Sequence, residues 1–515
     1  MSRYARREFL ADIGRGMLIA GIGPVLAADL GLASAHAADG PETLSFGDRE
    51  PLVRLMQETP TDKLLPTLIA RLNGGTDLAA LVAAGALANA RSFGGQDYNG
   101  YHAFMALAPA FHMSAELSAE RRALPILKVL YRNTSRIHES GCGTREVLHP
   151  ISPAKLASNL SRGELLRAAT RKADMDEAEH TFAALAQISA DEAFNDLLYS
   201  VQDEVDVHRV VLAWRARALL DLAGQEQAHT LLRQSVRFCV SQEKDLQRRG
   251  RQAEIRTVLP KLLDQYRLLS KPPGTRSAED GQVAHLAEAI YSGSRPAAAE
   301  AVAAALAEGT APDTIGEALS LAANRLVLCD PGRRKEHAEA GKPEGSVHGA
   351  SVGVHACDAA NAWRNIARVS NARNVVCSLI VGAFHTGGQS TGQAAQPRPL
   401  PEHLEAIKTT DAAELLREAE AAVRNRDQAR AAAVVHRYGE LNLPHRPLFD
   451  VLLRYAISED GALHAEKFYR TVTEEFATTR PAFRWRHPVA LARVTASEYG
   501  YPAPGYAEAC KLLKV

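Results

Sequence analysis

The segment Ser346–Arg364, SVHGASVGVHACDAANAWR, combines metal-binding side chains with many small residues. His348 and His355 are seven residues apart, and Asp358 follows His355 by three. On an α-helix these spacings put all three side chains on one side, with the histidines within about 20° of each other and about 10 Å apart along the axis. Imidazole binds iron, copper or zinc, and a carboxylate can orient an imidazole or take up a proton. We therefore expect His348 and His355 to be metal ligands and Asp358 to be catalytic.

Two helical turns are too long a distance for one ion to bind both histidines directly. The segment is therefore expected to form one wall of a pocket that other metal-binding histidines complete. The candidates are His102, His208 and His385. His102 follows a Gly-rich turn at the start of an apolar segment, and His208 begins the apolar segment VHRVVLAWRARALL. His385 ends an apolar run where a glycine loop begins, which is a common position for a functional residue.

Three further histidines lie in helical patterns beside apolar residues: His112, His180 and His464. Glu177 and His180 have the Glu-x-x-His spacing with which pairs of helices bind two irons. Helix packing and solvent-exposed ion pairs account for these positions as well as a metal site does. The sequence leaves their roles open.

The segments that carry these residues are predicted to be helices, because apolar residues recur in them at three- and four-residue intervals. The sequences SRGE from Ser161 and DAAE from Asp411 have capping-box spacing, and Pro153 after Ser152 is typical of a first helical turn. Only NVVCSLIVGAF, residues 374–384, is compatible with either a buried helix or a lone strand. The expected fold class is all-α, an irregular array of antiparallel helix pairs with little or no sheet.

Two polar stretches divide the chain. One is CDPGRRKEHAEAGKPEGS, Cys329–Ser346, and the other is HTGGQSTGQAAQPRPLPEH from His385 onward, which is rich in Gly, Gln and Pro. The second stretch predicts a boundary near residue 395. We expect a main helical domain over residues 38–395 and a smaller C-terminal helical part, residues 396–515, packed on it.

Composition excludes several classes of protein. The 515 residues include 60 Lys and Arg and 60 Asp and Glu, so no overall field attracts nucleic acid. Among the six cysteines no two have Cys-x-x-Cys spacing, which argues against iron–sulfur clusters, zinc ribbons and c-type haem. Any metal is therefore expected to be bound mainly by histidines.

The N-terminal sequence SRYARREFLADIGRG places Arg6 and Arg7 before an apolar run, and Ala-His-Ala follows at 35–37. This pattern resembles a twin-arginine signal peptide over residues 1–37. The run is interrupted by Gly and Pro and is a poor membrane span. The resemblance implies that the mature chain is exported already folded, to the periplasm or beyond. Enzymes whose cofactor is loaded before export often use this route.

Together these features predict an exported helical metalloenzyme, an oxidoreductase with a His-rich site between helices and a small-molecule substrate. Iron or copper is expected in preference to zinc, because folded export is a familiar route for redox enzymes. Two alternatives stay open: a helical-repeat scaffold with structural histidines, and a metal-independent hydrolase or lyase with a His–Asp pair. No nucleic-acid partner and no membrane span of the mature chain are expected.

Overall fold

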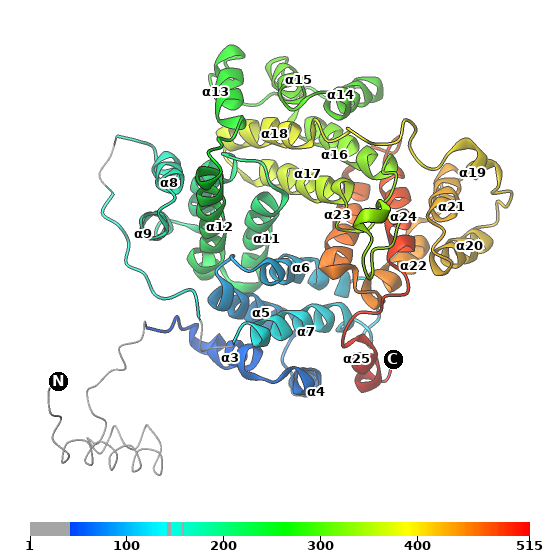
Figure 1. Ribbon diagram of the computed structural model, residues 1–515, viewed down its shortest axis with the longest axis horizontal. Coiled ribbons are helices and arrows are strands. Elements are labelled where there is room, and N and C mark those ends of the chain that lie inside the picture. The colour runs from blue at the N-terminus through cyan, green and yellow to red at the C-terminus, as the bar shows by residue number, and fades with distance from the viewer. Residues whose placement is uncertain (1–41, 142–145, 157–158) are drawn as a thin grey trace, which may run out of the picture. The chain divides into compact units, whose positions relative to one another are not determined.

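The computed structural model describes residues 42–141, 146–156 and 159–515. The expected signal peptide, residues 1–37, lies outside the described residues. Ser45–Val515 form one compact unit, and this unit is built from helices (Figure 1). The described part of the chain contains isolated β-bridges but no strand. The prediction of an all-α fold is confirmed.

The α-helices in the first half of the chain are α3 (Glu50–Glu58), α4 (Thr61–Asn73), α5 (Leu78–Phe93), α6 (Tyr98–Ser114), α7 (Leu124–Glu139), α8 (Arg162–Arg171), α9 (Met175–Leu185), α10 (Ala190–Val201), α11 (Val207–Ala223), α12 (Ala228–Arg248) and α13 (Ile255–Gln265). Those in the second half are α14 (Asp280–Ser292), α15 (Arg295–Ala307), α16 (Pro312–Leu328), α17 (Val352–Val369), α18 (Ala372–Thr386), α19 (Pro401–Glu405), α20 (Ala412–Arg424), α21 (Gln428–Glu440), α22 (His445–Ser458), α23 (His464–Thr478), α24 (Arg486–Glu498) and α25 (Tyr506–Leu513). Short 3₁₀ turns are η1 (Gly47–Arg49), η3 (Gln225–Gln227), η4 (Lys335–His337) and η5 (Gly461–Leu463).

Most of the local predictions agree with these elements. Residues 374–384 lie inside α18 and are therefore helical, and capping at Ser161 and Asp411 begins α8 and α20. The helix start predicted at Ser152 is wrong, because residues 151–156 are not helical. That segment is held instead by backbone bonds to α9, where the Ala154 amide donates to the carbonyl oxygen of His180.

A ring of four helices forms the centre of the unit. α6 packs against α11, α11 against α17, α17 against α23, and α23 against α6. These four helices lie together in the middle of the view in Figure 1, although they begin at residues 98, 207, 352 and 464. The ring therefore joins segments that are far apart in sequence, and its inner side is where side chains from all four can meet.

Small polar residues fix where three of these helices begin. The side chains of Asp97, Asp206 and Ser351 accept hydrogen bonds from backbone amides in the first turns of α6, α11 and α17. Such N-caps satisfy amides that have no partner within the helix, and each contributes about 1 kcal/mol. α23 has no side-chain cap and follows the turn η5 directly.

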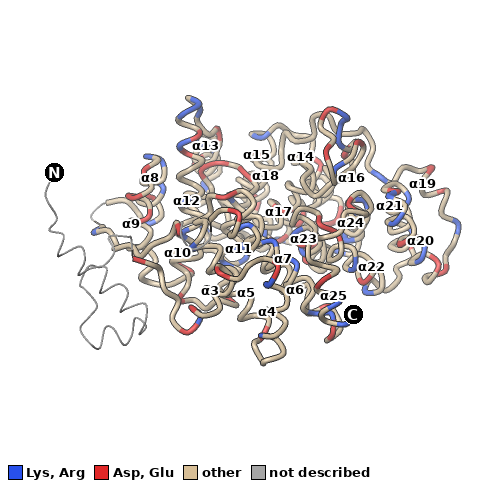
Figure 2. Tube along the Cα trace, turned by 60° about the horizontal axis from the view of Figure 1, so that its bottom comes forward, with Lys and Arg blue, Asp and Glu red and all other residues tan. Residues whose placement is uncertain are grey.

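The chain after residue 395 packs on the helices before it. α23 contacts α6 and α17, α24 contacts α16, and α25 contacts α4 and α7. A domain boundary near residue 395 stays a prediction. Acidic and basic residues are interspersed along the described helices (Figure 2). None of those helices is long and apolar enough to cross a membrane.

Candidate metal centre

Each helix of the central ring has a histidine near its N-terminal end. His102 lies in the first turns of α6, and His208 is the second residue of α11. His355 lies in the first turn of α17, and His464 is the first residue of α23. Neighbouring imidazole rings have centroids 4.8 to 5.6 Å apart all the way around: His102–His208, His208–His355, His355–His464 and His464–His102.

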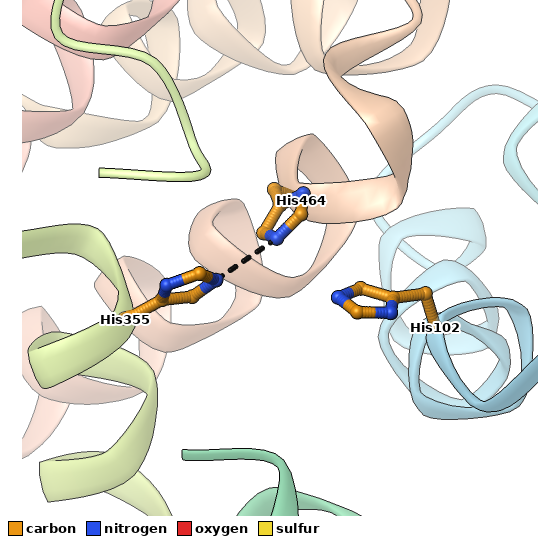
Figure 3. Close-up of side chains that lie close together, drawn as sticks. All are labelled: His102, His355 and His464. Atoms are coloured by element: carbon orange, nitrogen blue, oxygen red, sulfur yellow. Dashed lines mark hydrogen bonds between the residues drawn. The ribbon is translucent and has the colours of Figure 1, made fainter. Parts of the chain in front are cut away.

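Three of these histidines have nitrogen atoms close enough to share one metal ion (Figure 3). Their ligand atoms all lie within 4.8 Å of one another: His102, His355 and His464. The Nε2 atoms of His355 and His464 are 3.1 Å apart. Two nitrogens bound to one ion at about 2.0–2.1 Å are roughly 2.9–3.4 Å apart at angles of 90–109°. His355 and His464 therefore have the spacing of two ligands, and a shift of His102 by at most about 1–2 Å would bring it to the same spacing.

Backbone carbonyls set the tautomers of two of the three rings. Nδ1–H of His102 donates to the carbonyl oxygen of Tyr98 over 2.7 Å, and Nδ1–H of His464 donates to that of Ala462 over 3.0 Å. A neutral imidazole with a proton on Nδ1 has its lone pair on Nε2. Both Nε2 lone pairs are thus directed at the centre, and fixing the far nitrogen in this way is how proteins orient metal-binding histidines.

The Nε2 atoms of His102 and His208 are buried and have no hydrogen-bond partner among the residues that the structure describes. His208 lies beside the triad, and its Nδ1 is 3.6 Å from Oδ1 of Asp206. A buried polar atom without a partner costs about 1–3 kcal/mol. Two such atoms side by side in the ring are a feature that a bound ion would explain.

The three triad histidines are neutral at ordinary pH. Burial, and after it the nearby Lys467 ammonium, lower the pKa of His355 to about 3. The same two causes lower the pKa of His102 and His464 well below the ordinary value for imidazole. Neutral imidazole is the form that binds metals, so these groups need not lose protons when an ion enters.

Asp358 and Lys467 lie one turn further along α17 and α23 than the histidines of those helices. Asp358 is buried and accepts a hydrogen bond of 2.8 Å from the Thr471 hydroxyl. Burial raises the pKa of Asp358, and Lys467 opposes this shift. Burial also lowers the pKa of Lys467 to about 8. The predicted catalytic residue Asp358 therefore contacts Thr471 behind the triad, and its catalytic role stays a prediction.

The two remaining predicted ligands lie outside the triad. Nδ1 of His348 accepts from the Ala350 amide over 2.9 Å, and its Nε2 is 3.6 Å from Oε1 of Glu498. Nδ1 of His385 accepts from the Trp363 indole over 3.3 Å. Because Nδ1 of each ring accepts a hydrogen bond, the proton of the neutral imidazole lies on Nε2 and no lone pair is free for an ion. Metal binding by either residue stays a prediction that the geometry does not favour.

The expectation that His348 and His355 lie on one helix is wrong. Ser351 caps α17, which begins at Val352, so His348 lies in the preceding loop. The close approach expected of the small residues does occur. A Cβ added at Gly349 would lie 2.4 Å from Cβ of His464, and one at Gly353 would lie 2.6 Å from the backbone nitrogen of Val327. These glycines let the segment pack directly on α23 and α16.

Sequence reasoning did not place His464 in the site. The only local signal was a histidine that follows Gly461 at a helix start, and such a pattern is also typical of packing. Its role depends on α23 meeting α6 and α17, which no local pattern encodes. The other open histidines lie elsewhere: His112 at the exposed end of α6, and His180 on α9, where its Nδ1 donates to the Ser152 carbonyl over 2.5 Å.

A pocket of about 420 Å³ reaches the triad from the surface. It is lined by His102 and His464 and by residues of α6, α7, η5 and the loops before α17 and α25: Tyr98, Asn99, Tyr131, Arg132, Ser135, Arg136, Glu139, Lys342, Ala350, Ala462, Leu463 and Pro504. A larger pocket of about 690 Å³ shares only Ala350 with it and is lined by His348 but not by the triad. The smaller pocket is thus the one that gives a small molecule access to the histidines.

No protein-family model, no curated protein and no solved structure matches this chain. The functional argument therefore depends on the chemistry of the residues alone.

Proposed function

We propose that this protein is a metalloenzyme whose centre is one transition-metal ion bound by Nε2 of His102, His355 and His464. The observation that supports this most is the convergence of three neutral imidazoles from three helices far apart in sequence, two of them with fixed tautomers. Three protein ligands leave a coordination position open, which is typical of catalytic sites and not of structural ones.

His208 and Tyr101, which lie beside the triad, would each have a role in such a site. His208 faces the ion position from the fourth helix, with Asp206 at its other nitrogen, so it is placed to bind as a further ligand or to hold a proton. Tyr101 packs against both His102 and His208, with ring centroids 5.0 and 5.2 Å away. These rings exclude water from one side, and substrate reaches the other side through the pocket.

The metal we propose is iron or copper, and the reaction class is oxidation–reduction. An all-imidazole ligand set suits iron, copper and zinc. The twin-arginine pattern in residues 1–37 supports export in the folded state, which is a common route for redox enzymes. A bound redox metal would supply electron transfer and activation of a small molecule at its open position. The chain itself would position that molecule and exclude solvent.

Metal analysis of the protein purified from its native exported form tests this proposal. We expect about one equivalent of iron or copper per chain, because the three imidazoles form one site. About one equivalent of zinc, with no change in the spectrum on addition of dithionite or ferricyanide, would contradict the redox assignment. Less than about a tenth of an equivalent of any transition metal in a folded sample would contradict the metal centre itself.

A further inference from the structure

We propose that the pocket above the triad binds a small organic carboxylate, with the carboxylate against Arg132 and Lys342 and the reacting part against His102 and His464. This inference deepens the proposed function, since it assigns a substrate class to the same site. Three observations support it: the side chains that line the pocket, the available N–H groups of Arg132 and Lys342, and the lack of negative charge on the three triad imidazoles.

Two chemically different groups of side chains line the pocket. One is the pair of triad histidines, His102 and His464, and the other is three cationic side chains: Arg132, Arg136 and Lys342. Glu139 is the only carboxylate among the lining residues. A molecule that contacts both groups needs an anionic group for the cationic side chains and a second group that can react at a metal bound by the histidines.

The Arg132 guanidinium uses only part of its hydrogen-bonding capacity within the protein. Its Nη2 donates to Oδ2 of Asp460 over 3.0 Å, and this is its only side-chain partner among the described residues. A guanidinium carries five N–H groups in a planar fork that matches a carboxylate. Most of the Arg132 fork is thus available to a ligand, and its side chain is 34% exposed.

Lys342 is the second available cation. Its ammonium donates to Oε1 of Glu339 over 2.9 Å and has further N–H groups to offer. Arg136 differs from both, since Nε and Nη2 donate to Asp97 and Nη1 donates to Glu139. Glu139, the carboxylate in the pocket lining, is thereby paired with Arg136. Arg132 and Lys342 are therefore the two residues with which an anion would pair.

The ligand set adds to the preference for an anion. Three neutral imidazoles contribute no negative charge, so they leave the charge of a bound divalent ion uncompensated. An anionic substrate would balance this charge inside the pocket. The lining also includes apolar surface from Tyr98, Tyr131, Leu463 and Pro504. A volume of about 420 Å³ restricts the ligand to a small molecule with a short hydrocarbon or aromatic body.

Calorimetric titration of the full metal-loaded chain tests this assignment. The probes are benzoate, succinate, phenyl phosphate and benzamide, which is the neutral counterpart of benzoate in shape. We expect at least one of the two carboxylates to bind, and benzamide to bind at least about tenfold more weakly than benzoate, because a charge-assisted hydrogen bond is lost. Tighter binding of phenyl phosphate than of either carboxylate would assign the pocket to phosphate esters and overturn the proposal.

Substitutions locate the binding region. Arg132→Gln and Lys342→Gln should each weaken carboxylate binding roughly tenfold, and Arg132→Lys should recover part of the loss. Arg122→Gln, at an exposed arginine that does not line the pocket, is the matched control and should bind as the unsubstituted chain does. Unchanged binding in both pocket variants, or failure of both carboxylates to bind, would reject the proposal.

The metal content of each sample separates this inference from the proposed function. Carboxylate binding by a chain that takes up no metal would support the pocket assignment while the metal centre fails. Metal uptake without carboxylate binding would support the metal centre and reject the pocket assignment.

Discussion

At the scale of single residues, the site depends on which nitrogen of each imidazole carries the proton. The carbonyls of Tyr98 and Ala462 hold protons on Nδ1 of His102 and His464. Because Nε2 of His464 then lacks a proton, it is His355 that donates across the 3.1 Å contact between the two Nε2 atoms. An entering ion would replace this single hydrogen bond by three bonds to nitrogen, once the proton of His355 had moved from Nε2 to Nδ1.

His208 differs from the triad in its orienting partner. The carboxylate of Asp206 lies near Nδ1 of His208, whereas the Nδ1 atoms of His102 and His464 each face a backbone carbonyl. Burial alone would raise the pKa of Asp206, but its contacts with His208 and the Arg209 amide lower it to about 2. Asp206 is therefore ionised, and a carboxylate at Nδ1 makes the other nitrogen of an imidazole a stronger base. Asp206 is thus placed to orient the His208 ring toward the triad.

At the scale of elements, the turn before α23 is the most constrained part of the site. Gly461, Ala462 and Leu463 all have left-handed backbone conformations, with φ of 51°, 48° and 64°. A left-handed conformation costs a residue with a side chain about 1–2 kcal/mol. The turn brings the Ala462 carbonyl to Nδ1 of His464, so this strained conformation orients the His464 imidazole.

A buried ion pair holds the next turn of α23 in place. Nζ of Lys128 on α7 lies 2.6 Å from Oε1 of Glu466, and both side chains are fully buried. Lys128 also donates to the carbonyl oxygens of Ala456 and Glu459 at the end of α22. Removing one partner of such a pair leaves an unpaired buried charge, so the pair fixes where α23 begins relative to α7.

The strain in the turn predicts the effect of a single substitution. Ala462→Gly should raise the free energy of unfolding of the metal-free chain by up to about 1 kcal/mol, because glycine adopts positive φ without a steric penalty. Chemical denaturation followed by circular dichroism measures this change. Ala465→Gly, inside α23, is the matched control and should lower stability by about 1 kcal/mol. A loss of stability in both variants would contradict the strain argument.

The same elements show how far the sequence could predict the site. Apolar periodicity was enough for the all-α fold, and it placed His102, His208 and His355 on apolar helices that do meet. It could not predict His464, because no local pattern encodes the left-handed turn of Ala462 and Leu463 or the packing of α23. His348 was misplaced for a local reason, since the Ser351 cap ends the loop and begins α17 after it.

At the scale of the whole molecule, buried neutral histidines make stability depend on pH. Burial is the main cause that lowers the pKa of His355 to about 3 and of His348, His385 and His487 to about 4. In the unfolded chain these groups titrate near about 6.5. Below that pH the unfolded chain takes up protons that the folded chain does not, so the free energy of unfolding falls as the pH is lowered.

Denaturation of the metal-free chain at several pH values measures this effect. The denaturation midpoint should fall steadily from pH 6.5 toward pH 4, and each histidine contributes up to about 1.4 kcal/mol per pH unit. Glu498 acts in the opposite sense, because burial raises its pKa to about 7 and the folded chain then takes up a proton first. Burial also raises the pKa of Asp196, Asp330 and Asp358. The nine described histidines whose pKa is lowered outweigh these four carboxyls. A midpoint that stays constant or rises over this range would show that the histidines are not held neutral by burial.

The measurement that tests the central claim most directly is the metal content of five single variants after equilibration with one equivalent of metal per chain. His102→Ala, His355→Ala and His464→Ala should each lose at least about nine-tenths of the ion, because each removes one of three ligands. His348→Ala and His385→Ala, matched controls outside the triad, should keep about one equivalent. Circular dichroism confirms that each variant is folded. Retention of the ion by the three triad variants, or its loss from the two controls alone, would contradict the account.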